Sequence, residues 1–136
     1  MKRPCLVLIA LIASAEAFAQ AWPARPIRII VPFPPGATME SVVRLLVPDL
    51  TKALGQPIIV ENKPGAGTVV GVDATAKAAP DGYTFGSVAN SFTVNATLVP
   101  RLPYDTLKDL QPVGLMAKTA NVLVAHPSVQ ANTLKE

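Results

Sequence analysis

The sequence is short of the residues that build metal sites and catalytic centres. Its 136 residues include one cysteine, Cys5, and one histidine, His126. One cysteine cannot form an intramolecular disulfide, and a lone histidine cannot assemble a metal cluster. A Ser-His-Asp triad would depend entirely on His126, and no serine stands in a G-x-S-x-G motif. We therefore expect no catalytic residue, no metal, no cofactor and no enzymatic activity.

Charge is also sparse, since charged residues make up 15% of the chain and the formal net charge is +3. Beyond the first three residues, lysines and arginines are scattered singly, without the basic patch that binds nucleic-acid phosphates. No segment has the roughly 20 consecutive apolar residues of a transmembrane helix. We therefore expect no nucleic-acid partner and no membrane insertion once any export signal is removed.

The first 19 residues have the layout of a secretory signal peptide. Lys2 and Arg3 form a basic start, residues 6–13 are apolar but too few to span a bilayer, and residues 17–19 read Ala-Phe-Ala, a small-x-small cleavage pattern. We expect cleavage after residue 19 and export of the remainder. Loss of Lys2, Arg3 and Glu16 lowers the 12 basic and 9 acidic residues to 10 and 8, a net charge of +2.

Apolar segments of strand length alternate with segments of helical periodicity. Strands are predicted at residues 26–31, 57–62, 83–88, 113–117 and 121–125, and helices at 40–54, 68–79 and 90–98. Gly55 ends the first helical pattern, and Pro48 inside it predicts a kink or a break. This alternation predicts an α/β fold with a mostly parallel sheet that helices cover on both faces.

A glycine-containing segment, GAGTVVG at residues 65–71, lies between a predicted strand and a predicted helix, as a dinucleotide-binding loop does. Its glycine spacing is one residue longer than that of the dinucleotide motif, and no acidic residue ends the next strand. Glycines that let the loop turn and the helix pack closely explain the pattern better. An exported nucleotide-using enzyme is the weaker alternative.

The segment VPFPPGATMES, residues 31–41, leads from the first strand into the first helix. In open parallel sheets, ligands bind at the carboxyl ends of strands where the strand order reverses, and helix N-termini there attract anions. Gly36 and Ala37 are small enough for a ligand to approach the backbone, and Thr38 can cap the helix or donate to a carboxylate. Residues 87–91 offer further donors after the third strand, so together the two loops predict half of a small-anion pocket. Two unoccupied helix caps are the alternative.

Several stretches also carry a family resemblance, and they follow one another in family order over nearly all of the chain after the expected signal. They are Trp22-Pro23, PIRIIVPFPPG at 26–36, LGQP at 54–57, VENKPGAG at 60–67, AKAAPDGYT at 76–84, LPYD at 102–105 and VLVAHP at 122–127. With these stretches the chain resembles the substrate-binding proteins of tripartite tricarboxylate transporters, the Bug family of bacterial periplasmic receptors.

The resemblance implies a two-lobed, type II periplasmic-binding-protein fold that closes over a small carboxylate-bearing solute. Such a receptor works in the periplasm as a monomer and offers the solute to the permease subunits of the transporter. Residues 20–127 would form the first lobe and residues 128–136 the start of the crossover, with the second lobe missing. Presentation of the ligand to a two-component sensor, and a truncated product that does not bind, are the alternatives.

In the family, the first loop holds a ligand carboxylate with backbone amides and ordered water, and the loop after the third strand also belongs to the site. The resemblance places ligand-binding residues at Phe33, Pro34, Pro35, Gly36, Ala37, Thr38, Ser87, Val88, Ala89 and Asn90. The family usually has a second glycine at Ala37, a small or hydroxylated residue at Met39 and aspartate at Glu40. We expect Ala37 to resist positive φ, Met39 to add bulk beside the pocket, and Glu40 to favour the helix N-terminus or to enter the site.

Overall fold

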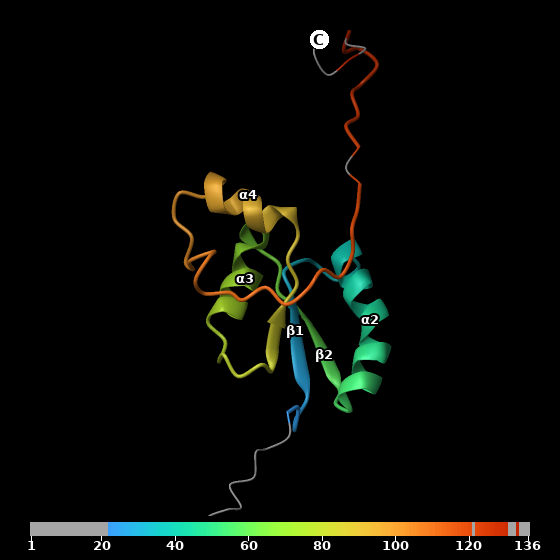
Figure 1. The fold of residues 1–136 in the computed structure, drawn as a ribbon. Helices are drawn as coiled ribbons and strands as arrows, with labels where there is room; N and C mark the ends of the chain where they lie inside the picture. Colours follow the sequence, from blue (N-terminus) through green and yellow to red (C-terminus); the bar gives the residue numbers. More distant parts are fainter. Residues whose placement is uncertain (1–21, 121, 131–132, 134–136) are drawn as a thin grey trace, which may run out of the picture.

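The computed structural model describes residues 22–120, 122–130 and 133. The expected signal peptide, residues 1–19, therefore lies outside the described residues. In chain order the elements are β1 (Ile27–Val31), α2 (Thr38–Leu54), β2 (Ile58–Asn62), the short 3-10 turn η1 (Ala66–Thr68), α3 (Val69–Ala76), β3 (Thr84–Gly86) and α4 (Asn90–Leu98), as Figure 1 shows.

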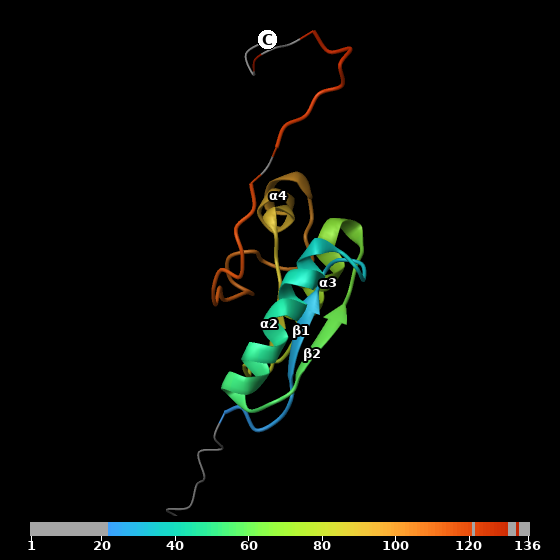
Figure 2. The same cartoon turned by 90° about the vertical axis from the view of Figure 1, so that its right-hand side faces the viewer.

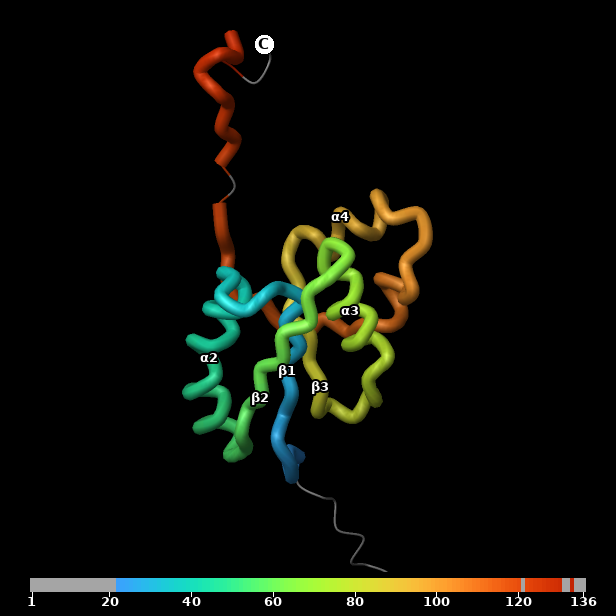
Figure 3. The backbone as a smooth tube through the Cα atoms, turned by 180° about the vertical axis from the view of Figure 1, so that it is seen from behind, coloured from blue at the N-terminus to red at the C-terminus, as the bar shows by residue number. Residues whose placement is uncertain are grey.

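The three strands form one parallel sheet in the order β2-β1-β3, with β1 in the centre (Figure 3). Ile27 pairs with Ile58 and Val31 with Asn62 on one side, and Ile29 pairs with Phe85 on the other. The central place suits β1 because its residues are nearly all apolar and buried. Since the chain leaves β1 toward one neighbour and later returns to the other, the strand order reverses at β1, as the position of its loop predicted.

Helices cover both faces of the sheet, which confirms the predicted α/β architecture (Figure 2). On one face, Val43 of α2 packs with Ile29 and Val31 of β1 to form the core. Partly buried apolar residues surround this core: Phe33, Met39, Leu50, Ile58, Val60 and Phe85. On the other face α3 contacts β1 and β3, and Val72 of α3 is buried.

Helix α2 runs without a break from Thr38 to Leu54, through Pro48. Of the kink or break predicted at this proline, the break is therefore wrong. Pro48 and Arg44, whose carbonyl loses its usual donor, are both exposed, so water can replace the missing hydrogen bond. The end of the helix is as predicted: Gly55 has φ 65°, a left-handed conformation suited to glycine, and its N–H donates to the Thr51 carbonyl.

The two last predicted strands are not present. Residues 113–117 and 122–125 contain no strand, while Asn121 lies outside the described residues. Instead the chain after residue 109 crosses the body and runs away from it as an extended segment (Figure 1). Leu115 is 72% exposed and Leu123 79% exposed. An apolar pattern forms a strand only where a neighbouring strand can complete the hydrogen bonds, and the described residues provide none here. Within the described part of the chain, no helix is both long and apolar enough to cross a membrane.

Candidate functional site

The loops after β1 and β3 lie side by side because these strands are neighbours in the sheet. Ser87, the first residue after β3, joins them directly. Its N–H donates to the Ile30 carbonyl at 2.9 Å and its hydroxyl approaches the same oxygen at 3.4 Å. Ser87 is 2% exposed, and both of its donors face the Ile30 carbonyl of the sheet. The two predicted loops therefore meet at one edge, with Ser87 as their internal link.

The first loop has few main-chain donors of its own. Pro34 and Pro35 have no N–H, and the Ala37 N–H donates to the Pro34 carbonyl at 3.2 Å. Gly36 has φ 84°, so it takes the positive φ that the turn needs. Ala37 has φ −69° and ψ 152°, an ordinary extended conformation for alanine. The expected conflict at Ala37 is absent because the preceding glycine makes the turn.

Main-chain donors gather instead at the start of α2. Ala37 is the N-cap residue and makes no side-chain cap hydrogen bond. The Ser41 N–H makes the first bond of the helix, to the Ala37 carbonyl at 3.1 Å. The N–H groups of Thr38, Met39 and Glu40 precede that bond and point out of the helix end. Of the two roles predicted for Thr38, capping the helix is wrong, because α2 already begins at Thr38 and Ala37 is its N-cap. Donation to a ligand carboxylate stays a prediction.

Glu40 interacts with the loop that precedes it. Its Oε2 accepts the Gly36 N–H at 2.5 Å, and its Oε1 accepts the Arg44 Nε–H at 2.7 Å. Glu40 is only 5% exposed. The hydrogen bond from Gly36, followed by that from Arg44, lowers the pKa of the Glu40 carboxyl below its usual 4.5. A buried carboxylate thus lies at the candidate anion site, and its charge is partly balanced by Arg44.

Met39, by contrast, packs against the hydrophobic core beneath α2. Part of its bulk therefore serves the core, and the expectation that the rest stands beside the pocket stays a prediction. The apolar spacing of α2 places Met39 one turn before Val43, which is buried in that core.

The second loop leads into the start of α4. Ala89 is its N-cap and makes no side-chain cap bond, and the Phe92 N–H donates to the Ala89 carbonyl at 2.9 Å. Val88 and Asn90 are exposed. The N–H groups of Asn90 and Ser91, like those at the start of α2, precede the first bond of their helix and lie at the carboxyl edge of the sheet.

A third loop, which sequence reasoning interpreted as a packing device, also reaches this region. Residues 65–68 have four consecutive positive φ angles, including φ 46° at Ala66 and φ 85° at Thr68. Asn95 of α4 donates to the Gly67 carbonyl at 2.8 Å, and the hydroxyls of Thr68 and Ser91 are 3.1 Å apart. The glycines were a usable signal for the turn. The contacts with α4 had no signal, because they join residues far apart in the sequence.

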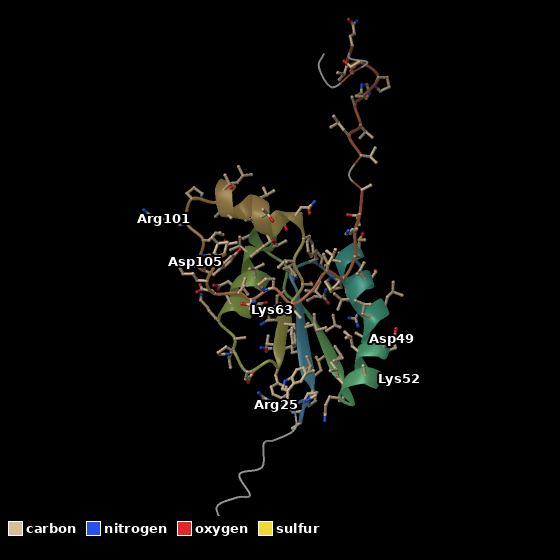
Figure 4. The ribbon with its side chains drawn as sticks, viewed as in Figure 1. Arg25, Asp49, Lys52, Lys63, Arg101 and Asp105 are labelled. Atoms are coloured by element: carbon tan, nitrogen blue, oxygen red, sulfur yellow. The ribbon has the colours of Figure 1, made fainter. Side chains whose placement is uncertain are left out.

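A hollow lies at the opposite end of the sheet from these loops. It has a volume of about 320 Å³ and is lined by Arg25, Pro26, Arg28, Ala79, Asp81, Tyr83 and Thr84, at the amino ends of β1 and β3. Figure 4 shows Arg25 at this end of the sheet. The candidate site lies at the opposite end of the sheet, where the loops and helix starts follow β1 and β3. In the described part of the chain, no group of three or more His, Cys, Asp or Glu side chains could hold a metal.

Comparison with known proteins gives one consistent family. The family model described as "Tripartite tricarboxylate transporter family receptor" matches residues 42–136. The chain is 44% identical to Protein BugT of Bordetella pertussis over 123 residues. This aligned region covers 89% of this chain and 38% of BugT. The chain therefore spans about two-fifths of the length of this curated relative.

Solved structures agree in fold. The periplasmic binding protein BugD is 33% identical, with a TM-score of 0.66 over 68% of this chain and 31% of BugD. MatC from Rhodopseudomonas palustris with bound malate is 38% identical, with a TM-score of 0.66 over 70% of this chain and 33% of MatC. The family model is thus named for a transporter receptor, and BugD is named as a periplasmic binding protein. Because the family model matches well over half of its residues, this chain belongs to the tripartite tricarboxylate transporter receptor family.

Proposed function

We propose that this chain is the first lobe of a periplasmic receptor that captures a small carboxylate-bearing solute for a tripartite tricarboxylate-type transporter. The observation that carries the proposal is the pair of helix starts, α2 and α4, above adjacent ends of β1 and β3. Neither start has a side-chain cap, so both leave main-chain donors for an anion. The malate bound to MatC supports the same class of ligand.

The ligand carboxylate would contact the loop residues that the family resemblance indicated, and the first turns of the two helices. In this proposal residues 33–38 form one wall and residues 87–90 the other, with Ser87 acting as the link between them. Residues 1–19 direct export, residues 20–127 form the lobe, and residues 128–136 begin the crossover to a second lobe. The lobe acts in the periplasm as a monomer, delivers its solute to membrane permease subunits and performs no reaction.

The test is a titration of residues 20–136 with malate, followed in amide proton–nitrogen NMR spectra. We expect the largest shifts at residues 36–40 and 88–91, and none with the uncharged diamide of malate. A well-dispersed spectrum that malate leaves unchanged would refute carboxylate binding by this lobe. Shifts centred instead on the arginines of the hollow at the other end of the sheet would refute the location.

A further inference from the structure

One loop amide of the candidate site is already occupied by a side chain of the protein. The Gly36 N–H donates to Glu40 Oε2 at 2.5 Å. The other loop amide, that of Ala37, donates to the Pro34 carbonyl. Because the two prolines have no N–H, residues 34–37 have no remaining main-chain donor. The donors left for a ligand at this wall are the first amides of α2.

Glu40 is placed to influence those amides. Its own N–H is one of the three that precede the first helical bond, and its carboxylate folds back onto the loop in front of the helix. Glu40 as a residue is 5% exposed, so water has little access to its side chain and screens its charge poorly. Arg44, one turn further along α2, contacts Glu40 Oε1 through both Nε and Nη2 at 2.7 Å. Arg44 is itself largely exposed, so it balances the charge only in part.

We propose that Glu40 is a specificity-determining residue, an internal carboxylate that holds the Gly36 amide and limits the ligand to the first-turn amides of α2. The inference rests on the proposed carboxylate-binding function. A ligand carboxylate at those amides lies near the Glu40 charge, so each additional negative group on the ligand meets repulsion. Glu40 therefore lowers affinity for anionic ligands and favours those with one carboxylate at this wall.

Charge and shape can be separated by substitution. Glu40→Gln keeps an oxygen that accepts the Gly36 N–H but removes the charge, whereas Arg44→Gln leaves the Glu40 charge uncompensated. Asp49→Asn is the matched control, because it removes one negative charge from the same helix. Asp49 is exposed, points away from the sheet (Figure 4) and lies roughly 13 Å further along the helix. At ordinary salt that distance screens its charge from the site.

The affinity of residues 20–136 for malate would be measured for the wild type and the three variants. We expect Glu40→Gln to bind malate roughly three- to tenfold more tightly, the effect of one partly screened charge, and Arg44→Gln to bind more weakly. Asp49→Asn should match the wild type. Unchanged or weaker malate binding by Glu40→Gln, with the wild type still binding, would overturn the proposal.

A ligand-free measurement separates this inference from the proposed function. The hydrogen bond to a carboxylate should shift the Gly36 amide proton downfield, and Glu40→Ala should remove that shift. If malate binds no variant, the proposed function fails, and the Gly36 shift still decides whether Glu40 occupies the amide. A Gly36 resonance that does not respond to Glu40→Ala would overturn the inference on its own.

Discussion

Thr38 is the first residue of α2, and its main-chain N–H is one of the few donors that the candidate site exposes. Ala37 before it has φ −69° and ψ 152°, the extended conformation that a residue preceding proline requires. The first position of a helix also tolerates proline, because its N–H has no partner inside the helix. At this position a single amide can therefore be deleted while the helix is kept.

We predict that Thr38→Pro weakens malate binding about tenfold, since one hydrogen bond to a charged group is lost. Thr38→Ala is the matched control, because it removes the hydroxyl and keeps the N–H. Calorimetric titration of both variants, with helix content checked by circular dichroism, measures the difference. Equal affinities in a folded Thr38→Pro variant would show that this amide does not contact the ligand.

Glu40 also makes stability depend on pH. Its pKa is lowered in the folded protein, first by the Gly36 hydrogen bond and then by Arg44, so its stabilising contribution is complete above about 4.5 and is lost as pH falls through the lower folded value. The Asp105 carboxyl has a lowered pKa for a similar reason, a hydrogen bond from the Leu107 N–H. Both carboxylates thus favour the folded state at neutral pH, and each contribution is lost as pH falls through its lowered folded-state pKa.

We therefore expect Glu40→Gln to flatten, but not abolish, the fall in melting temperature between neutral pH and pH 3. Asp105 contributes to the remaining fall in melting temperature, so the double variant with Asp105→Asn should show a still smaller fall. Thermal melts across this pH range measure both effects. An unchanged slope in Glu40→Gln would contradict the folded-state pKa assigned to Glu40.

At the scale of elements, α3 depends on a glycine for its close approach to the sheet. A Cβ atom on Gly71 would lie 2.6 Å from Pro32 Cβ and 2.7 Å from the Lys63 carbonyl oxygen, both closer than packed atoms allow. Part of this contact is backbone, which cannot rotate aside. The helix that covers the second face of the sheet can therefore lie where it does only with glycine at position 71.

We predict that Gly71→Ala destabilises the chain by about 1–3 kcal/mol, the usual cost of overpacking. Gly114→Ala is the control, because no atom lies within 4 Å of the Cβ it would add and its φ is not in the glycine range. Denaturant unfolding of both variants measures the free energy of unfolding. A Gly71→Ala variant as stable as Gly114→Ala would mean that α3 can move away at little cost.

The elements that sequence patterns predicted well are those whose partners lie nearby in the chain. The β-branched run at residues 27–31 and the helical spacing at 38–54 each bury an apolar side against the other. The apolar segments at 113–117 and 122–125 have the same local signal but no strand. The apolar pattern of a segment shows which side chains it could bury. It does not show whether another element is present to pack against them.

In the candidate site, too, only the features with a local sequence pattern could be predicted. The two loops could be predicted because the switch-point rule depends only on strand order, and β1 lies at the switch. The contact between Glu40 and Gly36 could not, because the sequence favours Glu40 equally as a residue for the helix N-terminus or for the site. The bond from Asn95 of α4 to the Gly67 carbonyl joins a helix to a loop through tertiary packing, which has no local pattern.

For the whole molecule, the main contrast lies between the α/β body and the extended segment that follows residue 109. The body has buried residues in β1, α2 and α3, whereas residues 111–120 are all exposed. Backbone without neighbours opens at little cost to a protease, while backbone inside a packed body requires unfolding.

We predict that trypsin cleaves after Lys118 well before it cleaves after Arg44, although both side chains are exposed. Arg44 lies within α2, whose backbone hydrogen bonds must first open, and Lys118 lies in the extended segment. Mass spectrometry of a brief digest measures the order of cleavage. Early cleavage after Arg44 would show that α2 is less stable than its packing indicates.

The uncapped helix starts have a consequence for how receptors of this kind change over time. Neither Ala37 nor Ala89 contributes a side-chain cap, so the proposed grip on the carboxylate is made by main chain. Main-chain donors come with the fold and survive most substitutions, whereas a substitution at a surrounding side chain such as Glu40 changes the charge that the ligand meets. Binding of the carboxylate and the choice of solute would then depend on different parts of the protein. Substitutions of side chains around the site could bring in a new solute, while the main-chain donors that bind the carboxylate stay the same.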